Sequence, residues 1–169
     1  MIFVTKIKDF KKINKKLLLL INEIEKNPYT TNKDNIFHTD WNLPKNFKRK
    51  YMDYFVFIIR PYLNEIAKKL HSEKAVIDNM WFQQYKKNGE HSWHTHGLSN
   101  FSNVYFVELP SKSLATEILN VNNLNLEEGN LLTFPSHLYH RSPINKTNKR
   151  KTIISFNCDF VNYMDYSKI

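Results

Sequence analysis

The segment Trp81–His96, with the sequence WFQQYKKNGEHSWHTH, takes the chain from helical to extended patterning and carries two closely spaced histidines. On an extended backbone, residues i and i+2 project to the same face, so His94 and His96 are predicted to aim at one point. His140 ends a second segment, FPSHLYH, which follows another predicted strand. Together the three imidazoles are predicted to occupy one face of a metal ion and to leave its opposite positions open for catalysis.

The chain after Ser72 consists of short β-branched and aromatic runs separated by turns, which is typical of strands. Strands are predicted at Ala75–Tyr85, Asn103–Leu109, Ala115–Asn120, Asn130–Phe134 and Lys151–Phe160. The only three glycines, Gly89, Gly97 and Gly129, fall in or beside the connections, where each indicates a turn.

The chain before Ser72 has helical periodicity instead. Apolar residues recur every three or four positions from Asp9 to Asn27, which predicts an amphipathic helix. A turn-rich stretch, Asn27–Pro44, follows, and a second helix is predicted to begin near Lys45, with Pro61 kinking it or starting a new segment. The expected fold class is therefore α+β, with N-terminal helices flanking a β-rich core.

Length and composition favour one domain. A chain of 169 residues, 41% of them hydrophobic, can bury a substantial core without dividing. We predict a single domain over residues 1–169, in which residues 1–72 are mainly helical support and residues 73–163 form the β core that carries the metal site.

The charge and cysteine content restrict the cellular setting. The formal net charge is +9, but the positive residues are scattered and almost all lysine, so a nucleic-acid partner is possible but not favoured. The lone Cys158 excludes a disulfide framework, is expected to be a small buried hydrophobe, and predicts a reducing, cytoplasmic location. No apolar run is long enough to span a membrane, and the first residues, MIFVTKIKDFKK, do not resemble a signal peptide, so the mature chain is expected to begin at Met1.

The other histidines divide into two pairs. His91 and His137 lie within three residues of a candidate ligand and are candidates for supporting the site, whereas His38 and His71 lie outside the cluster and are predicted to be ordinary surface residues.

Three segments between Trp81 and Asn157 carry a family resemblance. They read WFQQYKKNGEHSWHTHGLSNFSNVYFVELP, EEGNLLTFPSHLYHRSPIN and KRKTIISFN. In order and spacing they resemble the iron(II)- and 2-oxoglutarate-dependent oxygenases, in particular small phage and bacterial members. The resemblance implies a double-stranded β-helix, the cupin-like jelly roll, flanked by helices.

The same resemblance implies Fe(II) at His94 and His140, with position 96 supplying the remaining ligand. That position is usually Asp or Glu in the wider superfamily. Because His96 is neutral, the site would be one charge unit more positive than the usual one.

The co-substrate 2-oxoglutarate needs a cation for its far carboxylate, because a buried unpaired carboxylate costs several kcal/mol. The family places that cation about ten residues beyond the distal histidine, where Arg150 and Lys151 both stand. Alignment on the last strand favours Lys151, whereas the forked guanidinium of Arg150, with the Thr152 hydroxyl two residues on, is the alternative. Further candidates for hydrogen bonds to the co-substrate are Gln83, Tyr85 and Tyr105.

The resemblance implies a dioxygenase that uses Fe(II), 2-oxoglutarate and O₂ to hydroxylate a substrate, with release of succinate and CO₂. Two alternatives stay open at this point. The first is a three-histidine cupin-type dioxygenase that does not use 2-oxoglutarate, which the histidine at position 96 motivates. The second is a noncatalytic basic jelly-roll module that binds nucleic acid or another partner, which the net charge motivates.

Overall fold

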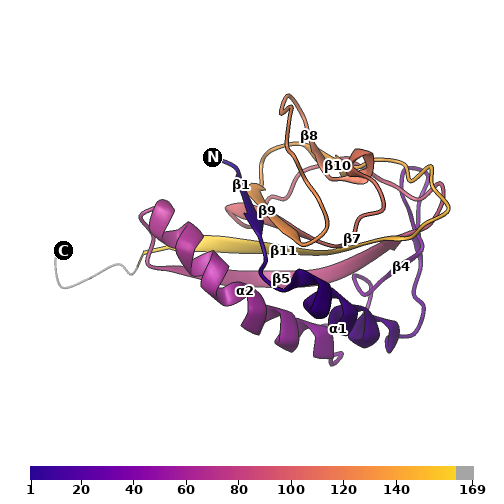
Figure 1. The fold of residues 1–169 in the computed structure, drawn as a ribbon, viewed down its shortest axis with the longest axis horizontal. Coiled ribbons are helices and arrows are strands. Elements are labelled where there is room, and N and C mark those ends of the chain that lie inside the picture. Colours follow the sequence, from indigo (N-terminus) through magenta and orange to yellow (C-terminus); the bar gives the residue numbers. More distant parts are fainter. Residues whose placement is uncertain (163–169) are drawn as a thin grey trace.

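The structure, a computed structural model, describes residues 1–162 and is mostly β-sheet with two helices (Figure 1). Its large sheet has six strands, and every pairing between them is antiparallel. In order across the sheet, these are β1 (Phe3–Lys6), β9 (Asn130–Pro135), β7 (Phe101–Glu108), β11 (Lys151–Val161), β5 (Lys74–Tyr85) and β4 (His38–Thr39).

Two smaller sheets accompany the large one. The first has three short strands in the order β6 (His91–His94), β10 (His140–Ser142) and β8 (Glu117–Ile118). The second pairs β2 (Tyr29–Thr30) with β3 (Asn35–Ile36). The three-stranded sheet holds two of the candidate ligands.

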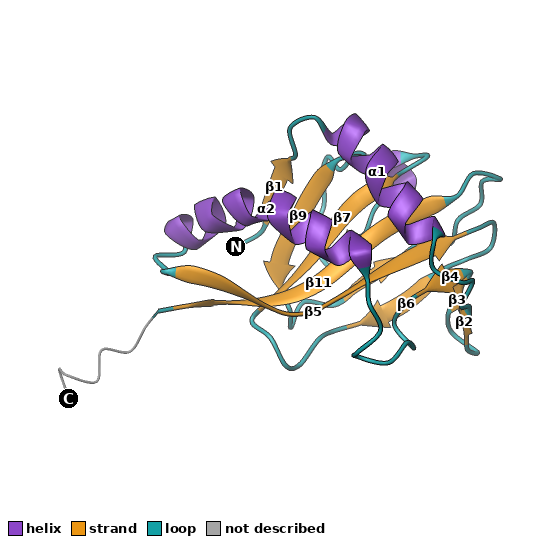
Figure 2. Cartoon of the chain, turned by 90° about the horizontal axis from the view of Figure 1, so that it is seen from below, coloured by secondary structure: helices purple, strands orange, loops and turns teal. Residues whose placement is uncertain are grey.

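Both helices lie across one face of the large sheet (Figure 2). Helix α1 (Phe10–Asn22) buries Leu17 and Ile21, and helix α2 (Lys50–Lys69) buries Phe55 and Ile59 in the same hydrophobic core. That core also contains side chains from β5, β7, β9 and β11. Burying an aliphatic or phenylalanine side chain completely contributes about 1.5–3 kcal/mol, so these helices hold the sheet from one side.

The opposite face of the large sheet carries a second core. Because side chains alternate along a strand, Val104 and Phe106 of β7 belong to this second core while Tyr105 and Val107 belong to the helix side. Its other members include Ile118 of β8, so this core lies between the large sheet and the three-stranded sheet. The two layers enclose the candidate site.

The four long predicted strands are confirmed to within a few residues, as β5, β7, β9 and β11. The predicted strand Ala115–Asn120 is only the two-residue β8, preceded by a short 3₁₀ helix at Lys112–Leu114. Both helices are shorter than predicted, and Pro61 lies inside the continuous helix α2 without starting a new segment. The N-terminal part also adds the edge strands β1 and β4 to the large sheet, which the sequence pattern missed because both are short.

Within residues 1–162, no helix is both long enough and apolar enough to cross a membrane.

Candidate metal centre

His94 and His140 face each other across neighbouring strands. They are directly paired residues of β6 and β10, and their ring centroids are 4.2 Å apart. The chain reaches β6 through a tight turn at Gly89, where a Cβ atom would lie 2.8 Å from the carbonyl oxygen of Asn35. A side chain at position 89 would therefore push apart the segments that hold β6 in place.

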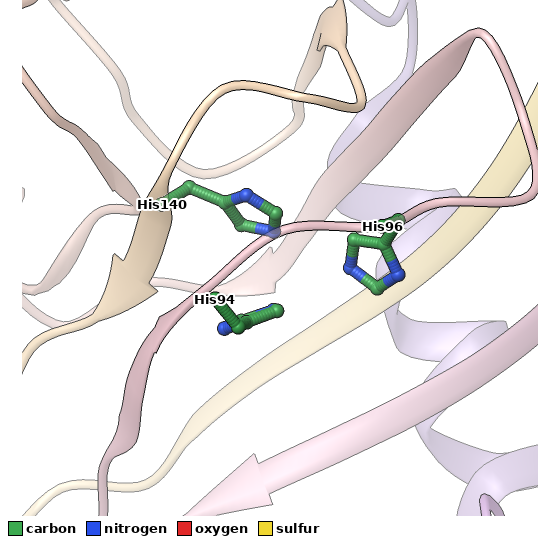
Figure 3. A group of neighbouring side chains, drawn as sticks. All are labelled: His94, His96 and His140. Carbon is green, nitrogen blue, oxygen red and sulfur yellow. The ribbon is translucent and has the colours of Figure 1, made fainter.

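His96 completes the group from just beyond the end of β6. Its backbone N–H donates to the carbonyl of Ser136 at 3.0 Å, which ties this segment to the turn before β10. One ring nitrogen from each of His94, His96 and His140 lies within 4.8 Å of the others (Figure 3). The structure thus brings together the three histidines that the sequence singled out.

Backbone carbonyls orient two of the three rings. Nδ1 of His94 lies 2.7 Å from the carbonyl oxygen of Ser92, and Nδ1 of His140 lies 3.0 Å from that of Leu138. A carbonyl only accepts hydrogen bonds, so each Nδ1 must carry a proton. In the neutral imidazole this leaves the lone pair on Nε2, the nitrogen free to bind a metal.

Burial keeps the three rings neutral. Desolvation, reinforced by the nearby histidines, lowers the pKa of His96 to about 4 and that of His140 to about 3. Desolvation also lowers the pKa of His94. At neutral pH all three imidazoles therefore offer a lone pair without first losing a proton.

The His91 ring packs against the His94 ring. The two rings stack with centroids 3.9 Å apart, and Nδ1 of His91 lies 3.3 Å from the Gln83 side-chain nitrogen. Asp34 approaches the other side of His91, with a carboxylate oxygen 3.7 Å from Nε2. His91 is thus in a position to support His94, as predicted, whereas His137 is exposed.

Lys151 is fully buried, and no carboxylate pairs with it among residues 1–162. Its ammonium donates to the Ser142 hydroxyl at 2.7 Å and lies 5.2 Å from the Tyr85 ring centre. Desolvation lowers the pKa of Lys151 to about 7. The Tyr85 hydroxyl is also buried, and in the described part of the chain it has no well-formed hydrogen bond. A cation and a hydroxyl without full partners are a suitable environment for an anion.

Arg150 and Thr152 lie elsewhere. Arg150 donates two hydrogen bonds to the Glu108 carboxylate, at 2.8 and 3.1 Å, and the Thr152 hydroxyl donates to the same carboxylate. Both sides of this ion pair are partly exposed. Strand alternation separates Lys151 from its two neighbours, so the structure brings neither Arg150 nor Thr152 to the histidines.

Three other predicted residues have clear positions. Gln83 and Tyr85 line the cavity beside the histidines, whereas Tyr105 points to the helix side, where its hydroxyl donates to Asn14 at 2.6 Å. Cys158 is buried as predicted, and burial raises its thiol pKa to about 12.

The prediction for His38 was wrong, whereas His71 is exposed as predicted. His38 is buried, with its ring nitrogens 3.1 Å from the Gln84 side-chain oxygen and 3.1 Å from the Glu25 carbonyl. It lies on β4, a two-residue strand without a sequence signature.

An aromatic-walled cavity of about 280 Å³ opens next to the histidines. Trp41, which is 51% exposed, packs edge-on against Trp81 with ring centroids 4.6 Å apart, and Trp81 lies against His96. Tyr29 and Asp34 also line this cavity. Tyr29, Asp34 and Trp41 could not be predicted from the sequence, because the turn-rich stretch that contains them has no recognisable motif.

Comparison with known proteins finds similarity at the level of structure. No family model matches the sequence, and no curated protein matches it significantly.

Three solved structures illustrate the similarity. The viral collagen prolyl hydroxylase of Paramecium bursaria Chlorella virus-1, solved with 2-oxoglutarate, has a TM-score of 0.64 at 16% identity over 92% of this chain and 95% of that one. A Pseudomonas putida prolyl-4-hydroxylase gives a TM-score of 0.66 at 11% identity over 92% and 91% of the two chains. The non-heme α-ketoglutarate-dependent epimerase SnoN of nogalamycin biosynthesis gives 0.67 at 10% identity over 93% and 76%. The chain therefore has the fold of the 2-oxoglutarate/Fe(II) oxygenases.

Proposed function

We propose that this protein is an Fe(II)- and 2-oxoglutarate-dependent dioxygenase that hydroxylates a C–H bond of an organic substrate. The observation that carries the proposal is the pairing of two features in one site: three neutral, convergent histidines and a buried lysine without a carboxylate partner. The fold shared with enzymes of this chemistry supports it.

The three histidines fit a divalent metal. Imidazole nitrogen suits iron among the first-row metals, and a ligand set from one side leaves positions for co-substrate and O₂. His94, His96 and His140 would hold Fe(II) through Nε2. When bound, Fe(II) would couple reduction of O₂ to decarboxylation of 2-oxoglutarate to succinate and CO₂, with oxidation of the substrate.

Lys151 would bind the far carboxylate of 2-oxoglutarate. Its ammonium lies under the cavity wall made by Tyr85 and Ser142, where an incoming carboxylate would find a cation and hydroxyl donors. The innermost space is only about 20 Å³, which is room for about one water molecule. Binding of the five-carbon diacid therefore requires side chains of this wall to move.

The aromatic-walled cavity would receive the primary substrate. It adjoins His94 and His96, so a group held against Trp81 would lie beside these two rings. The walls exclude water from the reacting atoms and orient the C–H bond to be oxidised.

The test is spectroscopic. The anaerobic protein with Fe(II) and 2-oxoglutarate is expected to show a metal-to-ligand charge-transfer band in visible light, and His140→Ala is expected to lose it. His71→Ala, which removes an exposed histidine away from the cluster, serves as the matched control. Absence of the band at saturating 2-oxoglutarate would refute chelation of the co-substrate.

A second candidate is a three-histidine dioxygenase that binds its substrate directly to iron. The neutral ligand at position 96 and the small innermost space favour it. Oxygen uptake that depends on substrate but is indifferent to 2-oxoglutarate would select this alternative.

We further propose that the two facing sheets form the jelly roll, that residues 1–169 constitute one domain, and that the enzyme acts in the cytoplasm. The two cores on either side of the large sheet support the first two points.

A further inference from the structure

A chain of buried polar side chains leads away from the His96 ring. Asn157 of β11 is 5% exposed, and its amide nitrogen lies 3.3 Å from Nδ1 of His96. The amide oxygen of Asn157 accepts from the Ser102 hydroxyl at 3.0 Å, and the Ser102 and Ser136 hydroxyl oxygens are 3.2 Å apart. Four residues from four different segments thus form one continuous hydrogen-bonded line.

The hydrogen bonds of this line can run in two opposite directions of donation, called here the first and the second sense. In the first, Ser136 donates to Ser102, Ser102 donates to the Asn157 oxygen, and the Asn157 nitrogen donates to Nδ1 of His96. In the second, the Asn157 amide is turned by 180°, its oxygen accepts from Nδ1 of His96, and its nitrogen donates to Ser102, which then donates to Ser136. Every link of the line joins a donor to an acceptor in either sense, although the Ser136 hydroxyl donates within the line only in the first.

The two senses differ in what they leave on the metal-facing nitrogen. When Nδ1 of His96 accepts a hydrogen bond, the proton of the neutral ring sits on Nε2, which then has no lone pair for a metal. When Nδ1 donates, Nε2 is free to bind. His94 and His140 have no such choice, because backbone carbonyls hold their Nδ1 protons in place.

We propose that Asn157 is a positioning residue that makes His96 a metal ligand, by presenting its amide oxygen to Nδ1 and thereby fixing the proton there. The proposal deepens the function proposed above and rests on it for the identity of the metal site. Metal binding at Nε2 selects the second sense along the whole line, so Ser102 and Ser136 reverse their donor direction when the ion binds. The unusual third histidine thus requires a side-chain partner from β11, where the other two rings use main-chain atoms of their own segments.

The experiment uses Zn(II) as a diamagnetic probe and compares substitutions at position 157. Asn157→Asp supplies only acceptor oxygens, so it can only accept from Nδ1 of His96, as metal binding requires, while Ser102 donates to its other oxygen. It is expected to retain or increase zinc affinity. Asn157→Leu cannot accept and is expected to weaken zinc binding by about 10- to 100-fold, the usual effect of losing such a partner. Thr133→Val is the matched control, because it removes another fully buried hydroxyl, one that donates to Asn103 and has no contact with His96.

Nitrogen NMR of the imidazoles gives a second, independent readout. In the zinc-loaded wild-type protein, Nδ1 of His96 is expected to carry a proton that exchanges slowly because Asn157 accepts it, and in Asn157→Leu this proton is expected to exchange faster. A proton on Nε2 of His96 in the zinc form would overturn the proposal. Zinc affinity of Asn157→Leu equal to that of the wild type would also overturn it, as would Asn157→Asp binding as weakly as a folded Asn157→Leu.

If Asn157→Leu does not fold, Asn157→Asp and the wild-type NMR spectrum still decide. The zinc measurements do not involve 2-oxoglutarate. A missing charge-transfer band would therefore refute the oxygenase function without affecting the zinc measurements. Zinc affinities that do not depend on residue 157 would refute the role of Asn157 and leave the charge-transfer band in place.

Discussion

Replacing Lys151 with methionine is expected to change two measured quantities in opposite directions. The stability of the metal-free protein should rise, because an apolar side chain of similar length replaces a fully buried ammonium that has no carboxylate partner. The affinity for 2-oxoglutarate should fall, because the proposed partner of its far carboxylate is gone.

The two magnitudes follow from the surroundings of Lys151. Burial lowers its pKa from 10.5 to about 7, which corresponds to a cost of several kcal/mol for keeping the folded-state charge at pH 7 and below. At pH 7 and below, Lys151→Met is therefore expected to be more stable than the wild type. This gain in unfolding free energy shrinks as pH rises toward 10.5, because the wild-type lysine is then neutral in the folded protein and increasingly neutral in the unfolded chain too. Removing one partner of a buried charge pair costs about 2–5 kcal/mol of binding energy, or about 30- to 5,000-fold in Kd.

Stability is measured by chemical denaturation of the metal-free protein, and affinity by titrating 2-oxoglutarate into the anaerobic Fe(II) protein while following the charge-transfer band. Arg150→Met is the control, since it removes the adjacent cation, which is bound to Glu108, and should leave the Kd unchanged. The reasoning fails if Lys151→Met binds 2-oxoglutarate like the wild type, or if Arg150→Met weakens binding as much.

Three further outcomes are expected. In the wild type, 2-oxoglutarate should bind more weakly as pH rises above about 7, because Lys151 of the unliganded protein then loses the proton that pairs with the carboxylate. Titrations at several pH values check this, and a Kd that does not change with pH would contradict it. Asp40→Ala should lower the unfolding free energy by about 3–5 kcal/mol, measured by urea denaturation, because its loss leaves Arg49 without its charge partner. The buried Asp40 carboxylate accepts from the Phe82 N–H at 2.9 Å, from the Tyr51 hydroxyl at 2.7 Å and from Arg49 at 2.9 Å. Fe(II) at about one hundred times its Kd, added anaerobically, should raise the unfolding free energy by about 2.7 kcal/mol, and a chelator should reverse this. A denaturation curve that Fe(II) leaves unchanged would argue against a metal site in the folded protein.

The His94–His96 pair could be predicted because its spacing is local. His94 and His96 stand two residues apart in an extended segment, and strand geometry alone turns such residues to one side. His140 needed the additional context of the FPSHLYH turn. The preference for Lys151 over Arg150 came from alignment of the last strand with the family pattern. The structure puts these two side chains in different surroundings, as strand alternation requires.

The residues that surround the cluster could not be predicted in this way. Trp41 reaches the cavity because the buried Asp40 ties its loop to Phe82 of β5, a contact between residues 42 positions apart. Asn157 meets His96 across 61 positions, and an asparagine within a strand carries no signal of such a partner. Tyr105 was expected near the co-substrate, but it faces the helices, since its place along β7 puts it on the opposite side from Val104 and Phe106.

The three-stranded sheet supplies His94 and His140, whereas the large sheet supplies Lys151 and Asn157. In the proposed function, the distance between these layers therefore sets how far 2-oxoglutarate must reach from the metal to the Lys151 ammonium. Apolar residues of the second core act as spacers that fix this length: Ile118 is the strand partner of His140, and the Phe134 ring packs edge-on against the His140 ring with centroids 4.7 Å apart. On that proposal, trimming or enlarging a spacer would change which chain length of dicarboxylate the site accepts, with every polar side chain retained.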